Sequence, residues 1–251
     1  MSGGARQEWT AWREARRRSA TAPHGTAALA LTAWLGPDAE EVRGLPGRWR
    51  LEADGAIVGE GFAPEHGVEG GELRLGPGQE HEFGEIIARR FDRDGTVALR
   101  VIDPAATSRT SIRDIDAFDY DPAWVVSGAF TPAAPAATVD VTAVDGRTSV
   151  ATVGGTIALE LPTGAAELTV TRNAAGRLSA VFSDGSSNVD VYRFRFIDVP
   201  EPVDGVATVD FTRAFLPPCA FSDEYVCPTP LPGNRWGVRV EAGEKTVVRA
   251  H

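Results

Sequence analysis

Lysine, methionine, cysteine and histidine are all scarce in this sequence of 251 residues, which holds one lysine, one methionine, two cysteines and four histidines. Long apolar runs are absent as well, since no segment approaches the roughly 18 apolar residues that a membrane-spanning helix requires. The N-terminal stretch MSGGARQEW lacks the apolar core of a secretion signal. These absences predict a cytoplasmic protein that makes no membrane contact.

Positive charge is also limited, because the formal net charge is −10 at pH 7. Proteins that bind nucleic acid take much of their affinity from clustered Lys and Arg side chains. The only basic run is WREARRRSA, with Arg13, Arg16, Arg17 and Arg18, and it is typical of the solvated face of one helix. We therefore expect no nucleic-acid partner.

The common signatures of cofactor and metal chemistry are missing. The sequence contains no P-loop, no G-x-G-x-x-G after a strand, no H-E-x-x-H, no G-x-S-x-G and no EF-hand loop. Nucleotide-dependent and zincin chemistry are therefore disfavoured, and no motif signals flavin or haem. We expect no cofactor and no resident metal.

The periodicity of the sequence indicates one helix followed by strands. Residues 8–20 (EWTAWREARRRSA) place Trp9 and Trp12 on one stripe of a helix, and TAPHG at 21–25 ends it. From there the alternation has a period of two, as in 96–103, 137–144 and 166–172. Asp-Gly pairs recur at 54–55, 94–95, 145–146, 184–185 and 204–205, and several separate alternating runs, as hairpin turns do. The pattern predicts a mainly β protein, an antiparallel β-sandwich or partly closed β-barrel with one short N-terminal helix.

The length is compatible with one large domain spanning 1–251. An Ala/Pro-rich stretch at 132–137 is the best candidate for a separation between two sheet lobes, with a soft boundary near residue 134.

Both cysteines lie in one proline-rich stretch, DFTRAFLPPCAFSDEYVCPTPLP, at 210–232. A disulfide between Cys219 and Cys227 would be worth roughly 2.5 kcal/mol by chain entropy, but a reducing cytoplasm opposes it. As zinc ligands the two thiols supply half of a tetrahedral set. As buried thiols they behave as small hydrophobic groups, and this is the interpretation that we favour.

Several polar residues near the C-terminus are candidates for a site. Asp210 ends an alternating run and lies three residues before Arg213, so the pair either organises a loop or holds a carboxylate in a pocket. Glu244 and Lys245 are adjacent, as solvated pairs often are, although Lys245 is the only lysine.

His24 lies in the turn after the helix, where its side chain either hydrogen-bonds to the backbone or reaches a cleft as a general base.

The blocks DFTRAFLPPCAF, CPTPLPGNRW and EAGEK resemble the C-terminal signature of domain-of-unknown-function family 1684, with looser similarity over most of the chain. The resemblance implies that the two thiols belong to a shared loop architecture. It also implies that the family's polar signature falls on Asp210, Arg213, Cys219, Cys227, Asn234, Glu244 and Lys245. The family brings no established activity with it.

This sequence departs from the family pattern in places. Thr212 and Leu216 stand where the family often has asparagine. DGSSNVDVY keeps Asp184 and Tyr192 of the family pattern but has Ser186, Asn188 and Val191 at its other positions. If the usual site of the family uses those positions, this member has a lost or altered activity.

Our first functional hypothesis is a small-molecule binder, whose catalytic form is a cofactor-independent enzyme of specialised metabolism that performs a cyclisation or an isomerisation. Asp210 would supply a carboxylate, Arg213 would orient it and Tyr192 would donate a hydrogen bond, whereas His24, Asn234, Glu244 and Lys245 would contribute to binding. One alternative is a non-enzymatic structural or partner-binding module, which predicts an exposed apolar patch. A second alternative is a metal-assisted hydrolase, which needs His24 or His66 near the cysteines. The sequence leaves the oligomeric state open.

Overall fold

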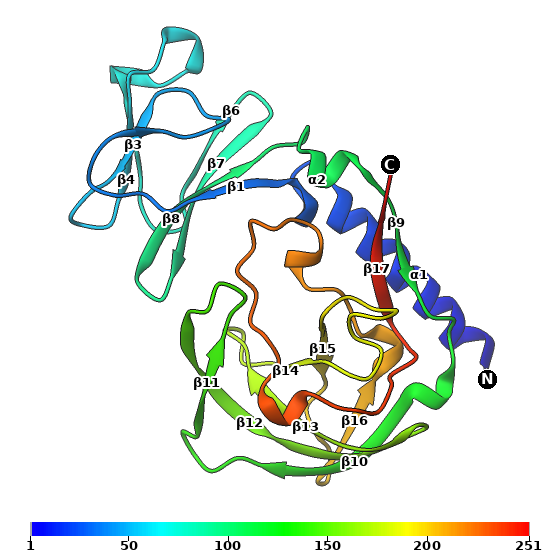
Figure 1. Ribbon diagram of the computed structural model, residues 1–251. Helices are drawn as coiled ribbons and strands as arrows, with labels where there is room; N and C mark the ends of the chain where they lie inside the picture. Colours follow the sequence, from blue (N-terminus) through cyan, green and yellow to red (C-terminus); the bar gives the residue numbers. More distant parts are fainter. Residues whose placement is uncertain (1, 251) are drawn as a thin grey trace. The chain divides into compact units, whose positions relative to one another are not determined.

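The computed structural model describes residues 2–250 and is mainly antiparallel β (Figure 1). Strands hold 44% of the residues and helices 17%, which confirms the predicted fold class. The chain forms two compact units. Of the described residues, the first unit comprises 2–17, 113–220 and 226–250, and the second comprises 18–112 and 221–225.

The first unit is built on a curled half-barrel sheet of seven strands. Six of them follow the order β15-β14-β13-β12-β10-β16, and the remaining strand, β11, pairs with β12. Their bounds are β10 (Val125–Pro132), β11 (Thr138–Thr142), β12 (Thr148–Leu161), β13 (Gly164–Arg172), β14 (Leu178–Phe182), β15 (Arg195–Val199) and β16 (Val206–Asp210). All the pairings in this sheet are antiparallel.

Two features curl this sheet. In β12 the register shifts between Val153 and Gly155, where a bulge bends the strand and Gly155 adopts a φ of 155° that favours glycine. At the other end, Phe215, which follows β16, bridges to Phe196 of β15. The two edges of the sheet are therefore linked through the segment that carries the predicted Asp210–Arg213 pair.

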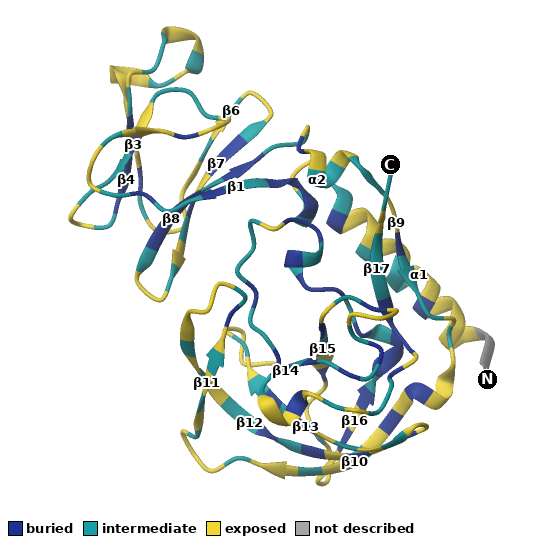
Figure 2. Cartoon of the chain, viewed as in Figure 1, coloured by how far each residue is buried: buried dark blue, intermediate teal, exposed yellow. Residues whose placement is uncertain are grey.

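The core of the first unit lies on one face of this sheet, where alternate residues of several strands, such as β13, β14 and β15, are buried (Figure 2). Leu168 and Val170 of β13 and Ile197 and Val199 of β15 belong to it. Phe211 and the segment around Val240 pack against the same cluster. The intervening residues of these strands face away from the core, because successive side chains of a strand point to opposite faces.

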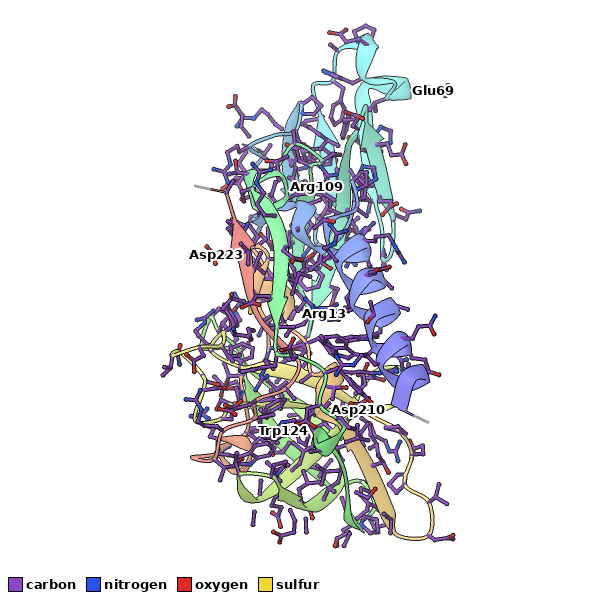
Figure 3. The ribbon with its side chains drawn as sticks, turned by 90° about the vertical axis from the view of Figure 1, so that its right-hand side faces the viewer. Arg13, Glu69, Arg109, Trp124, Asp210 and Asp223 are labelled. Atoms are coloured by element: carbon purple, nitrogen blue, oxygen red, sulfur yellow. The ribbon has the colours of Figure 1, made fainter. Side chains whose placement is uncertain are left out.

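Helix α1 (Ser2–Thr21) is fastened to the first unit by its polar side chains. The Trp9 indole donates to the carbonyl of Thr212 (2.9 Å), and Arg13, labelled in Figure 3, donates to the carbonyl of Ile115 (2.6 Å). A two-stranded sheet of β9 (Ile112–Ala117) and β17 (Glu244–Arg249) completes this part.

The second unit contains two four-stranded sheets. One has the order β1-β8-β7-β6 and the other the order β2-β3-β4-β5. The bounds are β1 (Leu29–Ala33), β2 (Glu40–Glu41), β3 (Arg48–Leu51), β4 (Ile57–Glu60), β5 (Glu72–Leu75), β6 (Glu80–Phe83), β7 (Ile86–Arg93), β8 (Thr96–Ile102) and helix α2 (Thr107–Thr110). The buried Trp49 packs in its core against Phe62 and Phe83.

Short 3-10 turns connect many of these elements: η1 (Thr26–Ala28), η2 (Pro64–His66), η3 (Glu69–Gly71), η4 (Pro122–Trp124), η5 (Phe211–Arg213), η6 (Pro218–Ala220) and η7 (Pro232–Asn234). The Asp94-Gly95 pair joins β7 to β8 with positive φ at both residues, 50° and 80°, as its sequence predicts. Among the residues that the structure describes, no helix is both long enough and apolar enough to span a membrane.

Two expectations need revision. The helix begins at residue 2 rather than at 8, and its basic run is not simply a solvated face. Arg13 and Arg16 are half-buried and bind groups of the first unit, while Arg17 and Arg18 are exposed. Residue 134 lies inside the first unit, between β10 and β11, whereas the chain passes between units near residues 17, 112, 220 and 225.

Candidate functional site

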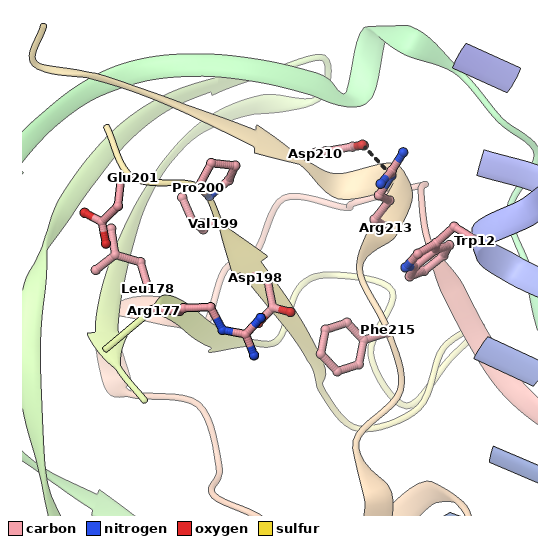
Figure 4. A pocket seen from close by; sticks show the side chains of 10 residues that line it. All are labelled: Trp12, Arg177, Leu178, Asp198, Val199, Pro200, Glu201, Asp210, Arg213 and Phe215. Carbon is pink, nitrogen blue, oxygen red and sulfur yellow. Dashed lines mark ion pairs between the residues drawn. The ribbon is translucent and has the colours of Figure 1, made fainter. Parts of the chain in front are cut away.

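A cleft of about 550 Å³ in the first unit brings polar and aromatic side chains together (Figure 4). We call it the Arg213 cleft. Its residues come from α1, from the ends of β14, β15 and β16, and from the segment after β16: Trp12, Arg177, Leu178, Asp198, Val199, Pro200, Glu201, Asp210, Arg213 and Phe215. All of them belong to the first unit.

A second cavity of about 410 Å³ adjoins this cleft, and we call it the Asn234 cavity. Asp198 and Phe215 line both. Its walls include the side chains that alternate with the core residues of the sheet, such as Thr169 and Thr171 of β13 and Phe196 of β15. The cavity therefore lies on the sheet face opposite the core, and the two hollows meet at Asp198 and Phe215.

The charged groups of the cleft fall into two sets. Glu201 is already paired with Arg172, at 2.7 and 3.2 Å, and this hydrogen bonding lowers the pKa of Glu201. By contrast, Arg177 and Asp198 are exposed, and neither makes a side-chain hydrogen bond or ion pair with the rest of residues 2–250. Figure 4 shows that both side chains line the cleft. An unpaired cation and an unpaired carboxylate are thus available to a ligand.

Asp210 and Arg213 do meet in the cleft, as the sequence predicts. Arg213 Nε lies 3.2 Å from Asp210 Oδ2. The other carboxylate oxygen of Asp210 accepts from the Thr212 amide (3.1 Å) and from the Thr212 hydroxyl (2.5 Å), so that Asp210 caps η5. Because its oxygens are occupied in this way, Asp210 organises the loop and places Arg213 at the cleft.

Tyr192 lies elsewhere and lines neither hollow. Its hydroxyl donates to the carbonyl of Cys219 (3.0 Å) and accepts from Arg193 (2.7 Å). Burial raises the pKa of Tyr192 to about 12. The structure therefore does not bring Tyr192 together with Asp210 and Arg213, and places it beside the cysteines instead.

Cys219 and Cys227 are both buried and are not joined by a disulfide. The Cys219 amide donates to the Cys227 sulfur at 3.2 Å. This agrees with the interpretation of buried thiols that we favoured from the sequence. Among residues 2–250 no group of three or more His, Cys, Asp or Glu side chains is arranged to hold a metal ion.

Asn234 lines the second cavity, but its amide is committed to the backbone of the sheet. β13 and β14 pair directly only at Thr171–Ser179 and Arg172–Leu178, and Asn234 bridges the gap beyond. Its Oδ1 accepts from the Thr169 amide (2.8 Å), and its Nδ2 donates to the carbonyls of Thr169 (2.9 Å) and Val181 (3.0 Å). Asn234 thus holds two strands together at the cavity wall.

We expect Asn234→Ala to lower the free energy of unfolding by about 3 kcal/mol, because it leaves buried backbone groups of Thr169 and Val181 without partners. Asn234→Asp keeps the size of the side chain but replaces its amide donor with a carboxylate oxygen, so we expect the free energy of unfolding to fall in this variant too. Denaturant unfolding measures both. Wild-type stability in Asn234→Ala would contradict this role.

Glu244 and Lys245 are structural in the same sense. Glu244, with a side chain 1% exposed, binds Arg16 of α1 through both oxygens (3.1 Å each) and accepts from the Leu216 amide (2.7 Å). Lys245 lies 2.8 Å from Asp116 and above the ring of Phe118. Neither residue lines the Arg213 cleft or the Asn234 cavity.

His24 belongs to the second unit, whereas the cleft belongs to the first. Its Nε2 lies 2.8 Å from the carbonyl oxygen of Glu85, which is the backbone interaction that the sequence offered as one of two roles.

Of the residues that line the cleft, the sequence predicts only Asp210 and Arg213 as site residues. Those that sequence reasoning missed include Trp12, Arg177, Asp198 and Phe215. Arg177 directly precedes β14 and Asp198 lies in β15, and these two strands pair through Leu178–Val199 and Ser179–Asp198. The alternation of 195–199 could have placed Asp198 on a polar face, but no local pattern shows what that face opposes.

Fold and site together define a mainly antiparallel β protein in which a curled half-barrel carries a polar cleft beside its N-terminal helix. The profile of the family described as "Protein of unknown function (DUF1684)" matches residues 110–245. The chain belongs to this family. The match spans most of the first unit and leaves nearly all of residues 18–112 outside it.

Among solved structures, the chain is similar to an uncharacterized protein from Haloarcula marismortui, determined by solution NMR. The two are 30% identical, the alignment covers 53% of this chain and 77% of the other, and the TM-score is 0.45. No functionally curated protein matches the chain.

Proposed function

We propose that the first unit binds a small molecule in the Arg213 cleft and the adjoining Asn234 cavity. The ligand carries an acidic group, a hydroxyl or amine that can donate a hydrogen bond, and an apolar ring or chain. The observation that carries this proposal is the pair of unpartnered charges, Arg177 and Asp198, beside the boundary of the two hollows.

Size and chemistry support the proposal. The volumes, about 550 and 410 Å³, lie within the roughly 300–1,000 Å³ that is usual for ligand pockets. The guanidinium of Arg177 can bind a carboxylate or phosphate through two parallel hydrogen bonds, and Asp198 can accept from a donor. Trp12 and Phe215 also line the cleft and supply its aromatic surface.

A cofactor-independent isomerisation or cyclisation in specialised metabolism is the catalytic form of this proposal. Asp198 is then the general base, since its oxygens are unoccupied, whereas those of Asp210 already bind Thr212 and Arg213. Arg177 and Arg213 would stabilise negative charge that develops on the substrate.

The alternative of a partner-binding module has less support. In the described chain the exposed large hydrophobic side chains are all valines, at 125, 150, 189, 203, 206 and 248. No exposed aromatic or leucine anchor of the kind that dominates protein interfaces accompanies them.

The test uses 8-anilinonaphthalene-1-sulfonate, a probe with one anionic group and aromatic rings, titrated by fluorescence. We expect Arg177→Ala to weaken binding about tenfold, as the loss of a hydrogen bond to a charged group does. Asp198→Asn removes a carboxylate that repels the sulfonate, so binding is retained or tightened.

Matched controls come from the second unit. Arg43 and Asp38 are also exposed and make no hydrogen bond or ion pair among residues 2–250. Arg43→Ala and Asp38→Asn should bind the probe as the wild type does. If Arg177→Ala is indistinguishable from Arg43→Ala, the cleft is not the binding site.

A further inference from the structure

The two cysteines form a close pair. Cys219 lies in η6, and the sulfur of Cys227 accepts a hydrogen bond from the Cys219 amide at 3.2 Å. The Cys227 thiol also hydrogen-bonds to the Cys219 side chain. A sulfur so near the backbone of its partner is within reach of a disulfide after side-chain rotation, because bridged cysteines need their Cβ atoms roughly 4 Å apart.

The surroundings of Cys219 make this thiol ionise more readily than an ordinary cysteine. The hydrogen bond from Cys227 lowers the pKa of Cys219 to about 7 against the opposing effect of burial, and Tyr192 and Arg193 lower it further. The Arg193 guanidinium donates to the Tyr192 hydroxyl, which in turn donates to the Cys219 carbonyl. Arg193 and Tyr192 thus hold the backbone of Cys219, and the positive charge of Arg193 favours a thiolate there.

The position of the pair in the chain is distinctive. The chain leaves the first unit after Ala220, contributes residues 221–225 to the second, and re-enters the first at Val226. Within the second unit, Ser222 donates to the Leu29 carbonyl (2.7 Å), and Glu224 accepts from the Thr32 amide (2.8 Å) and the Thr32 hydroxyl (2.9 Å). Cys219 and Cys227 thus flank the segment 220–226, one on each side.

We propose that Cys219 and Cys227 are a reversible disulfide pair. The bond forms by exchange with a low-molecular-weight disulfide and closes a loop around residues 220–226. The Cys219 thiolate attacks the external disulfide, forming a mixed disulfide and expelling one external thiolate. The Cys227 thiol then loses its proton and attacks the Cys219 sulfur, which forms the internal bond and expels the second thiolate. Two protein thiols are oxidised, one external disulfide is reduced, and both protons pass to the released thiols.

The bond would fix the distance between the two ends of residues 220–226 and so limit the opening of that segment. Because both side chains are only 4% exposed, the first attack requires a local opening, and the exchange is slower than that of an exposed thiol.

The experiment equilibrates the full chain with graded ratios of reduced and oxidised glutathione, followed by alkylation under denaturing conditions and mass analysis. We expect both thiols to be alkylated at the reducing end. At the oxidising end we expect neither to be alkylated, with the peptide that carries both cysteines lighter by the two thiol hydrogens and free of glutathione. Dithiothreitol restores both thiols. Hydrogen exchange at 220–226 is slower in the oxidised form.

Two variants separate the steps. In Cys227→Ser the resolving thiol is missing, so a glutathione adduct at Cys219 persists, whereas Cys219→Ser reacts more slowly because the activated thiolate is absent. The proposal is overturned if both wild-type thiols stay alkylatable at every ratio, or if the wild type stops at a stable glutathione adduct. Unchanged exchange at 220–226 in the disulfide form would contradict the constraint on that segment.

Discussion

Arg195→Met is expected to lower the free energy of unfolding by about 3–5 kcal/mol, because it leaves the carboxylate of Asp184 buried without its counter-ion. The two side chains are completely buried, with Arg195 Nη2 2.5 Å from Asp184 Oδ2. Arg195 also donates to the carbonyls of Ala242 and Val240 (2.9 Å for the latter). Burial lowers the pKa of Arg195, and the charge of Asp184 opposes that effect.

Thermal unfolding followed by circular dichroism measures this loss, which corresponds to roughly 10 °C in Tm for a chain of this size. Arg172→Met is the matched control, since its ion pair with Glu201 is exposed and such pairs contribute about 0–1 kcal/mol. The double variant Asp184→Asn/Arg195→Met should cost less than the sum of its parts, because no isolated charge remains. Additive losses would show that the two groups do not act as a pair.

Glu244→Ala has the second large expected effect, a loss of about 3 kcal/mol. Its carboxylate is buried and satisfies both Arg16 of α1 and the Leu216 amide, so truncation leaves that amide unpaired and releases the helix. Arg16 also lies over the ring of Phe215, 4.8 Å from its centroid, and Trp12 of the same helix lines the cleft. We therefore expect weaker probe binding in this variant as well as lower stability.

Denaturant unfolding and the fluorescence titration give the two readouts. Glu241→Ala is the control, because Glu241 is half exposed in its ion pair with Arg239 and its removal should change the stability by less than about 1 kcal/mol. If Glu244→Ala matches Glu241→Ala in both readouts, Glu244 does not fasten the helix.

The sequence predicted what depends on local pattern. Alternation and the Asp94-Gly95 turn predicted the β7–β8 hairpin, and the short spacing of Asp210 and Arg213 predicted their pairing. The Asp184-Gly185 pair resembles the same turn signal, but the Asp184 carboxylate points to Arg195, and Gly185 bonds to Val238. Contacts between residues far apart in the sequence decided that outcome.

The cleft could not be predicted from the sequence, for the same reason. Trp12, Arg177 and Asp198 meet only because β14 pairs with β15 and Phe215 bridges to Phe196, and no local period encodes either contact. Several polar residues that the family resemblance singled out, such as Asn234 and Glu244, fasten strands and helix. The groups left unpartnered, Arg177 and Asp198, lie outside that signature.

The central claim is that the Arg213 cleft and the Asn234 cavity form a ligand site. Amide chemical-shift mapping of the wild-type chain during titration with 8-anilinonaphthalene-1-sulfonate tests it most directly. We predict saturable shifts concentrated at 177–179, 196–201 and 210–215, with those of β3 and β4 unmoved. Shifts concentrated in the second unit, or spread without saturation over the whole chain, would contradict the account.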